Sequence, residues 1–232
     1  MPKIKEIYLW TTKVRPPVRS PSSSTVLYCP LKNNVSDATW NHSMSITTTS
    51  YWTVAKDSTW FYYFNWGYIT SENRSWPNEI TLSARVKRYN KHSSADGWAY
   101  FFSWHYRNGS PYHYFGIQAW TTGRWAEYTV YNGSARTYSW TALPLQTRTH
   151  VVMTYSSTSW LKAYQNGSQI GSVSTTWNIT SYSWPTNIGA TFAYGEQYFE
   201  WYLSEIILEN TPRDATKVSD YYNRTKWNYG IS

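Results

Sequence analysis

The sequence contains Asn-Gly dipeptides, and each of them predicts a tight turn between two antiparallel strands. In the run WLKAYQNGSQI, Asn166-Gly167 separates residues 160–165 from residues 168–170. Both turn residues accept the positive φ angles of a type I′ turn, whose twist matches that of the flanking strands, and such a turn is expected to be exposed. Asn108-Gly109 and Asn132-Gly133 are of the same kind. These three predicted turns favour β-hairpins and therefore an all-β fold.

Two further segments predict strands by their apolar pattern. In residues 79–87, EITLSARVK, every second residue is apolar, which predicts a half-buried strand with one solvated face. Residues 201–209 end in a mostly apolar run, which indicates a central strand.

One helix is expected after these strands. Thr211 is the predicted N-cap, Pro212 would occupy the first helical position, and Asp214 lies three residues after the cap. Ala215, Val218 and Tyr222 share one face at helical spacing. The helix is short and is expected to end near Asn223.

The composition supports strands and turns. At 232 residues the chain fits one large all-β domain, or two small ones at most. Aromatic residues make up 20% of it, with 23 Tyr and 16 Trp against 7 Phe, and Tyr and Trp suit half-exposed surfaces. Cys29 is the single cysteine, so no intrachain disulfide is expected. The chain has no apolar run of about 20 residues and no standard signal peptide.

Half of the formal net charge of +8 lies in the first tenth of the chain. Residues 1–24 hold five basic side chains and one acidic side chain, and they end in a linker-like stretch rich in Pro and Ser. We therefore predict an N-terminal arm over 1–24 and one jelly-roll domain over 25–232. The arm favours an acidic partner surface over nucleic acid. The candidate assembly residues are Lys3, Lys5, Trp10, Arg15 and Arg19.

Six segments carry a resemblance to a known family. They are VLYCPLKNN with Asp37 (26–37), YFNWGYI (63–69), ITLSARVK (80–87), HVVMTY with AYQNG (150–167), NIG (187–189) and LSEIIL (203–208). In this order they resemble motifs of the laminin-G-like branch of the concanavalin A-like jelly rolls. The resemblance covers about residues 25–223 and implies a two-sheet antiparallel sandwich with a closing helix. It also implies a hairpin at 63–69, and Trp201 departs from the family's usual glycine.

Aromatic residues at the consecutive positions 60–64 predict an exposed row of rings, because successive strand side chains alternate between faces. A second aromatic-rich region lies between residues 98 and 125. Aromatic rings stack on sugar rings, so this region is the predicted glycan-binding surface, with core packing as the alternative for each residue. The candidate glycan-binding residues are Trp98, Trp104, His105, Tyr112, Tyr114, Trp120 and Trp125.

The acidic residues do not predict catalysis. Glycosidases hold two carboxyl groups about 5–9.5 Å apart, whereas Glu196 and Glu200 are four positions apart, as are Glu205 and Glu209. Strand spacing separates such pairs by about 13 Å. A Gln-Ile-His signature of lyases within the fold is absent, since Gln118 lacks the following histidine. We therefore expect no catalytic residues.

Metal ligands and cofactors are not expected either. His105 and His113 are the closest functional-looking histidines, but a metal site needs a third ligand and supporting groups. Some laminin-G-like domains bind calcium, and in this chain Asp37 or Asp96 would be the candidate ligand. Because acidic ligands are sparse, we do not expect a calcium site.

Asn-x-Ser/Thr triplets are frequent, which predicts glycosylation and an extracellular location. Asn108 also begins such a triplet, but Pro111 follows it. The predicted glycosylation sites are Asn34, Asn41, Asn73, Asn132, Asn166, Asn178 and Asn223.

These features together favour a non-enzymatic structural protein of a virion surface, which assembles through its arm with itself or with other subunits and binds host surface glycans. The composition resembles that of structural proteins of viruses infecting archaea. The alternative is a secreted or cell-surface carbohydrate-binding module, and a polysaccharide-cleaving enzyme comes third.

Overall fold

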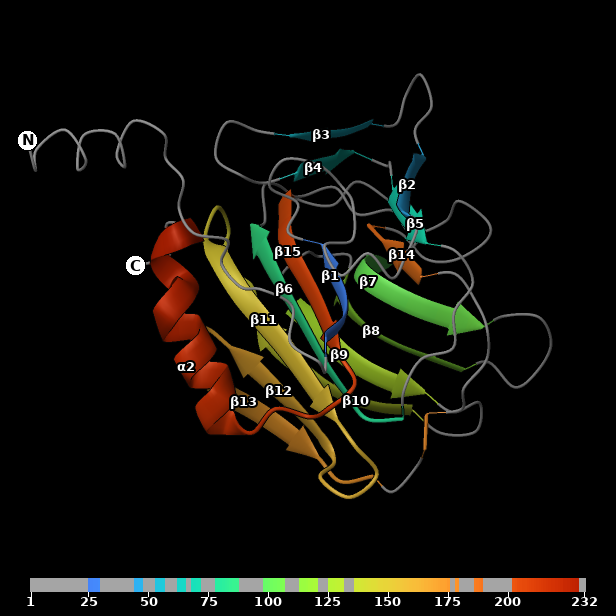
Figure 1. The fold of residues 1–232 in the computed structure, drawn as a ribbon, viewed down its shortest axis with the longest axis vertical. Coiled ribbons are helices and arrows are strands. Elements are labelled where there is room, and N and C mark those ends of the chain that lie inside the picture. The colour runs from blue at the N-terminus through green and yellow to red at the C-terminus, as the bar shows by residue number, and fades with distance from the viewer. Residues whose placement is uncertain are drawn as a thin grey trace, which may run out of the picture.

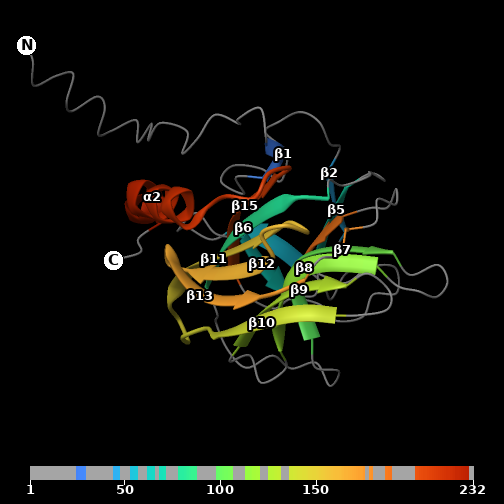
Figure 2. The ribbon, with the colours of Figure 1, turned by 90° about the horizontal axis from the view of Figure 1, so that it is seen from below.

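The structure is a computed structural model. It describes residues 25–29, 44–47, 53–56, 62–65, 68–71, 78–87, 98–106, 113–120, 125–131, 136–175, 178–179, 186–189 and 202–229. Within these residues two antiparallel sheets face each other, and a helix lies outside one of them (Figures 1 and 2). The predicted all-β sandwich with one short C-terminal helix is confirmed.

The first sheet runs in the order β13-β12-β11-β6-β15-β4-β3, and β1 also pairs with β15. Its strands are β1 (Thr25–Cys29), β3 (Thr53–Lys56), β4 (Tyr62–Asn65), β6 (Ile80–Lys87), β11 (Arg148–Tyr155), β12 (Leu161–Gln165), β13 (Ser168–Val173) and β15 (Tyr202–Glu209). We call it the helix-side sheet, because α2 (Ala215–Thr225) packs on its outer face. A 3₁₀ turn, η1 (Lys226–Tyr229), follows the helix.

The second sheet runs in the order β10-β9-β8-β7-β14-β5-β2 and is called the open sheet below. Its strands are β2 (Met44–Thr47), β5 (Tyr68–Ser71), β7 (Trp98–Tyr106), β8 (His113–Trp120), β9 (Trp125–Tyr131), β10 (Arg136–Ala142) and β14 (Thr186–Ile188).

The core lies between the two sheets. Along strands such as β6, β8, β9 and β11, alternate residues enter it, because successive side chains point to opposite faces. On the helix-side sheet these include Leu82 and Met153, and on the open sheet Phe102 and Phe115, whose rings stack with centroids 6.0 Å apart. The predicted central strand at 201–209 is confirmed: β15 pairs with β6 on one side and with β4 and β1 on the other.

The prediction that residues 79–87 form a half-buried strand is wrong in one respect. β6 is buried on both faces, since Thr81, Ser83 and Arg85 are as inaccessible as Leu82. The reason is the helix, which covers the polar face of this strand. A period of two reports the polarity of a strand face and not its burial.

The resemblance to a hairpin at 63–69 is also corrected. β4 belongs to the helix-side sheet and pairs with β3 and β15, whereas β5 belongs to the open sheet and pairs with β2 and β14. The chain therefore passes from one sheet to the other between Asn65 and Tyr68. Which sheet β4 and β5 each join depends on pairing with strands far away in the sequence. The local sequence of residues 63–69 does not predict that pairing.

The hairpin around Asn166-Gly167 is confirmed, with both residues at positive φ (49° and 82°) between β12 and β13. The prediction that this turn is exposed is wrong. Gly167 is buried and Asn166 half-buried, because Tyr222 of α2 packs against the turn. A Cβ atom on Gly167 would lie 2.9 Å from Cδ1 of Tyr222.

The predicted helix exists, but its N-cap is not the predicted Thr211. Asp214 is the N-cap: it is extended, and its Oδ1 accepts a hydrogen bond from the backbone N–H of Lys217 at 2.8 Å. Thr211 instead offers its backbone carbonyl to Oγ1 of Thr81. The helix continues to Thr225, beyond the predicted end at Asn223.

Candidate functional site

The open sheet has one face that the core does not use. In β9, Ala126, Tyr128 and Val130 enter the core, so the alternate positions Trp125, Glu127, Thr129 and Tyr131 form a row on the outer face. The register carries this division to the neighbouring strands, because directly paired residues share a face. Glu127 pairs with Gln118 of β8 and with Trp140 of β10.

Three polar side chains of this face form a hydrogen-bonded cluster. Gln118 Nε2 donates to Glu127 Oε1 at 2.8 Å, and Thr129 Oγ1 donates to the same oxygen at 2.5 Å. Gln118 is 1% exposed, and Glu127 and Thr129 are 0% exposed. The centre of the outer face is thus polar and screened from solvent.

Aromatic side chains flank this cluster. Trp125, two positions before Glu127 and about 7 Å along the strand, is 45% exposed. Tyr131 at the far end of the row and Trp140 across from Glu127 are half-exposed. Tyr and Trp combine an apolar ring with a polar group, which suits them to a ligand with both kinds of surface. We call Gln118, Trp125, Glu127, Thr129, Tyr131 and Trp140 the outer-face site.

The strand register assigns some of the predicted glycan-binding residues to positions on this face. Trp98 pairs with Trp120, and His105 pairs with Tyr114, at positions of the outer-face set. Trp104 pairs with Phe115, which lies in the core, so its position belongs to the opposite set. Tyr112 lies outside the described residues, and the ligand role of all seven residues remains a prediction.

Sequence reasoning did not select Glu127, Thr129, Tyr131 or Trp140, and it considered Gln118 only for a lyase motif. The available signal was the alternation in residues 125–131, WAEYTVY, which places a carboxylate between two aromatic residues on one strand face. Its pairing with Gln118 depends on the β8–β9 register, which the sequence does not supply.

A second polar cluster lies between the helix-side sheet and α2. Arg85 Nε donates to Glu205 Oε2 at 2.8 Å, and the other carboxylate oxygen accepts from the Tyr221 hydroxyl at 2.6 Å. Arg85 also donates to Thr225 of the helix. Glu205 has φ of 53° at the point where the β15–β6 register shifts, so a bulge turns this residue towards the helix.

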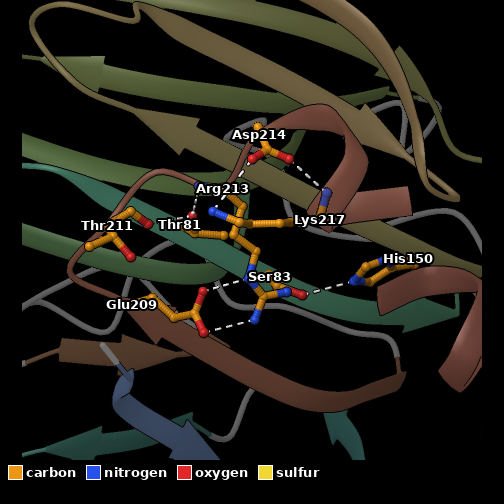
Figure 3. A network of polar contacts seen from close by, with 8 residues as sticks. All are labelled: Thr81, Ser83, His150, Glu209, Thr211, Arg213, Asp214 and Lys217. Carbon is orange, nitrogen blue, oxygen red and sulfur yellow. Dashed lines mark hydrogen bonds and ion pairs between the residues drawn. The ribbon is translucent and has the colours of Figure 1, made fainter. Parts of the chain in front are cut away.

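Arg213 and Glu209 form the second buried ion pair of this interface. Both guanidinium contacts are hydrogen bonds, at 2.5 and 2.8 Å, and the Arg213 backbone N–H donates to Thr81 (Figure 3). A bidentate contact of this kind fixes the relative orientation of the two side chains and also adds to the strength of the ion pair. Glu205 and Glu209 are therefore held by arginine at the helix interface, while Glu196 and Glu200 lie outside the described residues.

His150 completes the interface beneath the helix. Its Nε2 lies 2.8 Å from the Ser83 hydroxyl, its ring stacks on Tyr222 at 6.0 Å, and its Nδ1 has no hydrogen-bond partner among the described residues. Burial, followed by the nearby charges of Arg85 and Arg213, lowers the pKa of His150 well below its ordinary value. The residue is thus a neutral part of the packing.

Among the residues that the structure describes, no group of three or more His, Cys, Asp or Glu side chains is arranged to hold a metal ion. Within the same residues, no helix is both long and apolar enough to cross a membrane.

Three of the predicted glycosylation sites fall on described residues. Asn178 and Asn223 are exposed, whereas Asn166 is half-buried and its Oδ1 accepts a hydrogen bond from the His150 backbone N–H at 2.9 Å. The sites Asn34, Asn41, Asn73 and Asn132 lie outside the described residues, as do the assembly candidates of the arm. Glycosylation at every one of these positions remains a prediction.

Several solved structures share this architecture. Domain 4 of AbnA, a GH43 extracellular arabinanase from Geobacillus stearothermophilus in complex with arabinotriose, has a TM-score of 0.65 at 14% identity and covers 86% of this chain and 98% of its own. The binding domain of botulinum neurotoxin DC in complex with rat synaptotagmin II has a TM-score of 0.63 at 11% identity and covers 86% and 51%.

A botulinum neurotoxin type C structure, described as dependent for cell entry upon interaction with two ganglioside molecules, has a TM-score of 0.64 at 12% identity and covers 86% of this chain and 51% of its own. The chain thus spans about half the length of these neurotoxin chains. At such identities the likeness establishes the fold.

No curated protein sequence matches the chain. A laminin G family model, described as the concanavalin A-like lectin/glucanases superfamily, matches residues 65–219, more than half of the chain. With its two facing sheets and closing helix, the chain belongs to the concanavalin A-like lectin/glucanase superfamily.

Proposed function

We propose that this protein binds glycans through the outer-face site of the open sheet. The observation that carries the proposal is the juxtaposition of the Gln118–Glu127–Thr129 cluster with the exposed ring of Trp125. Sugars present hydroxyl groups at their edges and apolar C–H surface on their faces. Polar acceptors beside an aromatic ring match both, as in other ligand sites that combine apolar walls with a few placed polar groups.

The solved relatives support the same class of ligand. One was determined with arabinotriose, and another is described by its interaction with gangliosides. The proposal for this chain does not include hydrolysis. Among the described carboxylates, Glu205 and Glu209 are committed to buried arginine partners, and Glu127 accepts from Gln118 and Thr129. We therefore propose a binding protein without catalytic activity.

The test is a glycan array, followed by titration calorimetry on the ligands it finds. Trp125→Ala should weaken binding by about thirtyfold, because truncating a contact residue of this kind costs about 2 kcal/mol. Trp227→Ala is the matched control: Trp227 is 66% exposed but follows α2, on the other side of the sandwich. The proposal fails if no glycan binds, or if both variants bind as the parent does.

We propose further that the protein acts outside the cell, at a virion surface where residues 1–24 assemble it with neighbouring subunits. The support is the concentration of basic residues in that segment and the frequency of Asn-x-Ser/Thr triplets in the chain. Light scattering should give an assembly for the full chain and a monomer for a chain lacking residues 1–24. A monomer in both cases would favour the carbohydrate-binding module instead.

A further inference from the structure

Gln118 has an acceptor atom that the described fold does not use. Its Nε2 donates to Glu127 Oε1, whereas its Oε1 is buried and has no hydrogen-bond partner among the described residues. A buried acceptor without a donor costs free energy, and native proteins keep few of them. Because Gln118 lies on the outer face, this atom belongs to the outer-face site and not to the core.

The chemistry of its neighbours fixes the orientation of the Gln118 amide. Glu127 Oε1 already accepts from Thr129, and a carboxylate oxygen acts as an acceptor. The amide nitrogen must therefore face Glu127, since a flipped amide would place two acceptors together. The oxygen of Gln118 is consequently left to accept a hydrogen bond from another donor.

We propose that Gln118 is a specificity-determining residue of the outer-face site, whose Oε1 accepts a hydrogen bond from a hydroxyl group of a neutral sugar. Glu127 is the positioning residue that holds the amide in this orientation. This inference rests on the proposed glycan-binding function. A sugar hydroxyl can donate to Oε1, whereas the carboxylate of an acidic sugar cannot and would meet a second acceptor there.

Contact between a glycan and the buried Gln118 amide can be detected directly by NMR. The residue is 1% exposed, so a ligand reaches it only by displacing the groups that screen it. In a ¹⁵N-labelled protein, a neutral glycan should therefore shift the Gln118 side-chain amide resonances. The side-chain amide of Asn223, which contacts Ser219 on α2 at the other side of the sandwich, should stay in place. Unshifted Gln118 resonances in the presence of a bound glycan would overturn the proposal.

The binding experiment uses matched pairs of oligosaccharides with the same linkage and length: glucose with glucuronic acid, and galactose with galacturonic acid. The full chain should bind a neutral member at least about tenfold more tightly than its acidic counterpart. Gln118→Leu should weaken neutral binding by about tenfold and reduce this preference. Gln118→Asn withdraws the amide by one methylene and should act in the same direction, which covers a failure of the leucine variant to fold.

Glu127→Gln separates positioning from simple structural support. A glutamine at 127 can donate as well as accept, so the Gln118 amide becomes free to turn. The ratio of neutral to acidic affinity should fall, while neutral binding falls less than in Gln118→Leu. Equal or tighter binding of acidic sugars, with binding still sensitive to Trp125→Ala, would overturn this inference and leave the proposed function standing. No binding of any glycan would overturn both.

Discussion

His150 is the residue at which the stability of this fold should respond to pH. It is buried against α2 with its pKa well below 6.5, because burial and two arginines disfavour the charged ring. In the unfolded chain the ring takes up a proton as the pH falls below about 6.5, while in the folded chain it does not. The free energy of unfolding should therefore fall by about 1.4 kcal/mol per pH unit below that point.

Urea denaturation between pH 7.5 and 5.5 measures this slope. His150→Gln should be less stable at pH 7.5 but should show a flatter dependence on pH, since the titrating group is gone. A slope in His150→Gln equal to that of the parent would assign the pH dependence to other groups.

The Arg85–Glu205 pair provides a second prediction at the residue scale. Both side chains are fully buried, so removal of one partner leaves the other without its main compensation. Glu205→Gln should lower the free energy of unfolding by about 3–5 kcal/mol. Arg85→Met combined with Glu205→Leu should recover part of this loss, because no unpaired charge is buried. A double variant that loses as much stability as Arg85→Met and Glu205→Leu lose together as single variants would contradict this account.

At the scale of elements, α2 depends on its N-cap. Asp214 caps the helix through the Lys217 N–H, while Thr211 contributes a backbone carbonyl and an exposed side chain. Asp214→Ala should lower the melting temperature, because an orphan N–H loses its acceptor. Thr211→Ala should change it little. Thermal denaturation of both variants distinguishes the two residues, and a larger loss in Thr211→Ala would restore the cap that the sequence suggests.

The elements also show what the sequence can predict. The β12–β13 hairpin follows from Asn166-Gly167 alone, because the turn chemistry is local. The burial of Ser83 and Arg85 does not, because it depends on a helix about 130 residues further along the chain. Polar residues at alternate strand positions indicate a solvated face unless another element covers them, and the sequence does not show that cover.

At the scale of the whole molecule, the sandwich was predictable because six motifs lie in the order of one family. The passage from β4 in one sheet to β5 in the other was not, since each strand finds its partners far away in sequence. The outer-face site illustrates the same limit. The aromatic residues of the open sheet mark a surface in the sequence, but Gln118 and Glu127 meet only through strand register.

The measurement that tests the central claim most directly is amide hydrogen exchange of the full chain with and without a glycan from the array. If the outer-face site binds the ligand, protection should increase in β8, β9 and β10, over residues 113–142, and stay unchanged in α2, over residues 215–225. Protection confined to the helix side, or no change at a saturating glycan concentration, would contradict the assignment of binding to the open sheet.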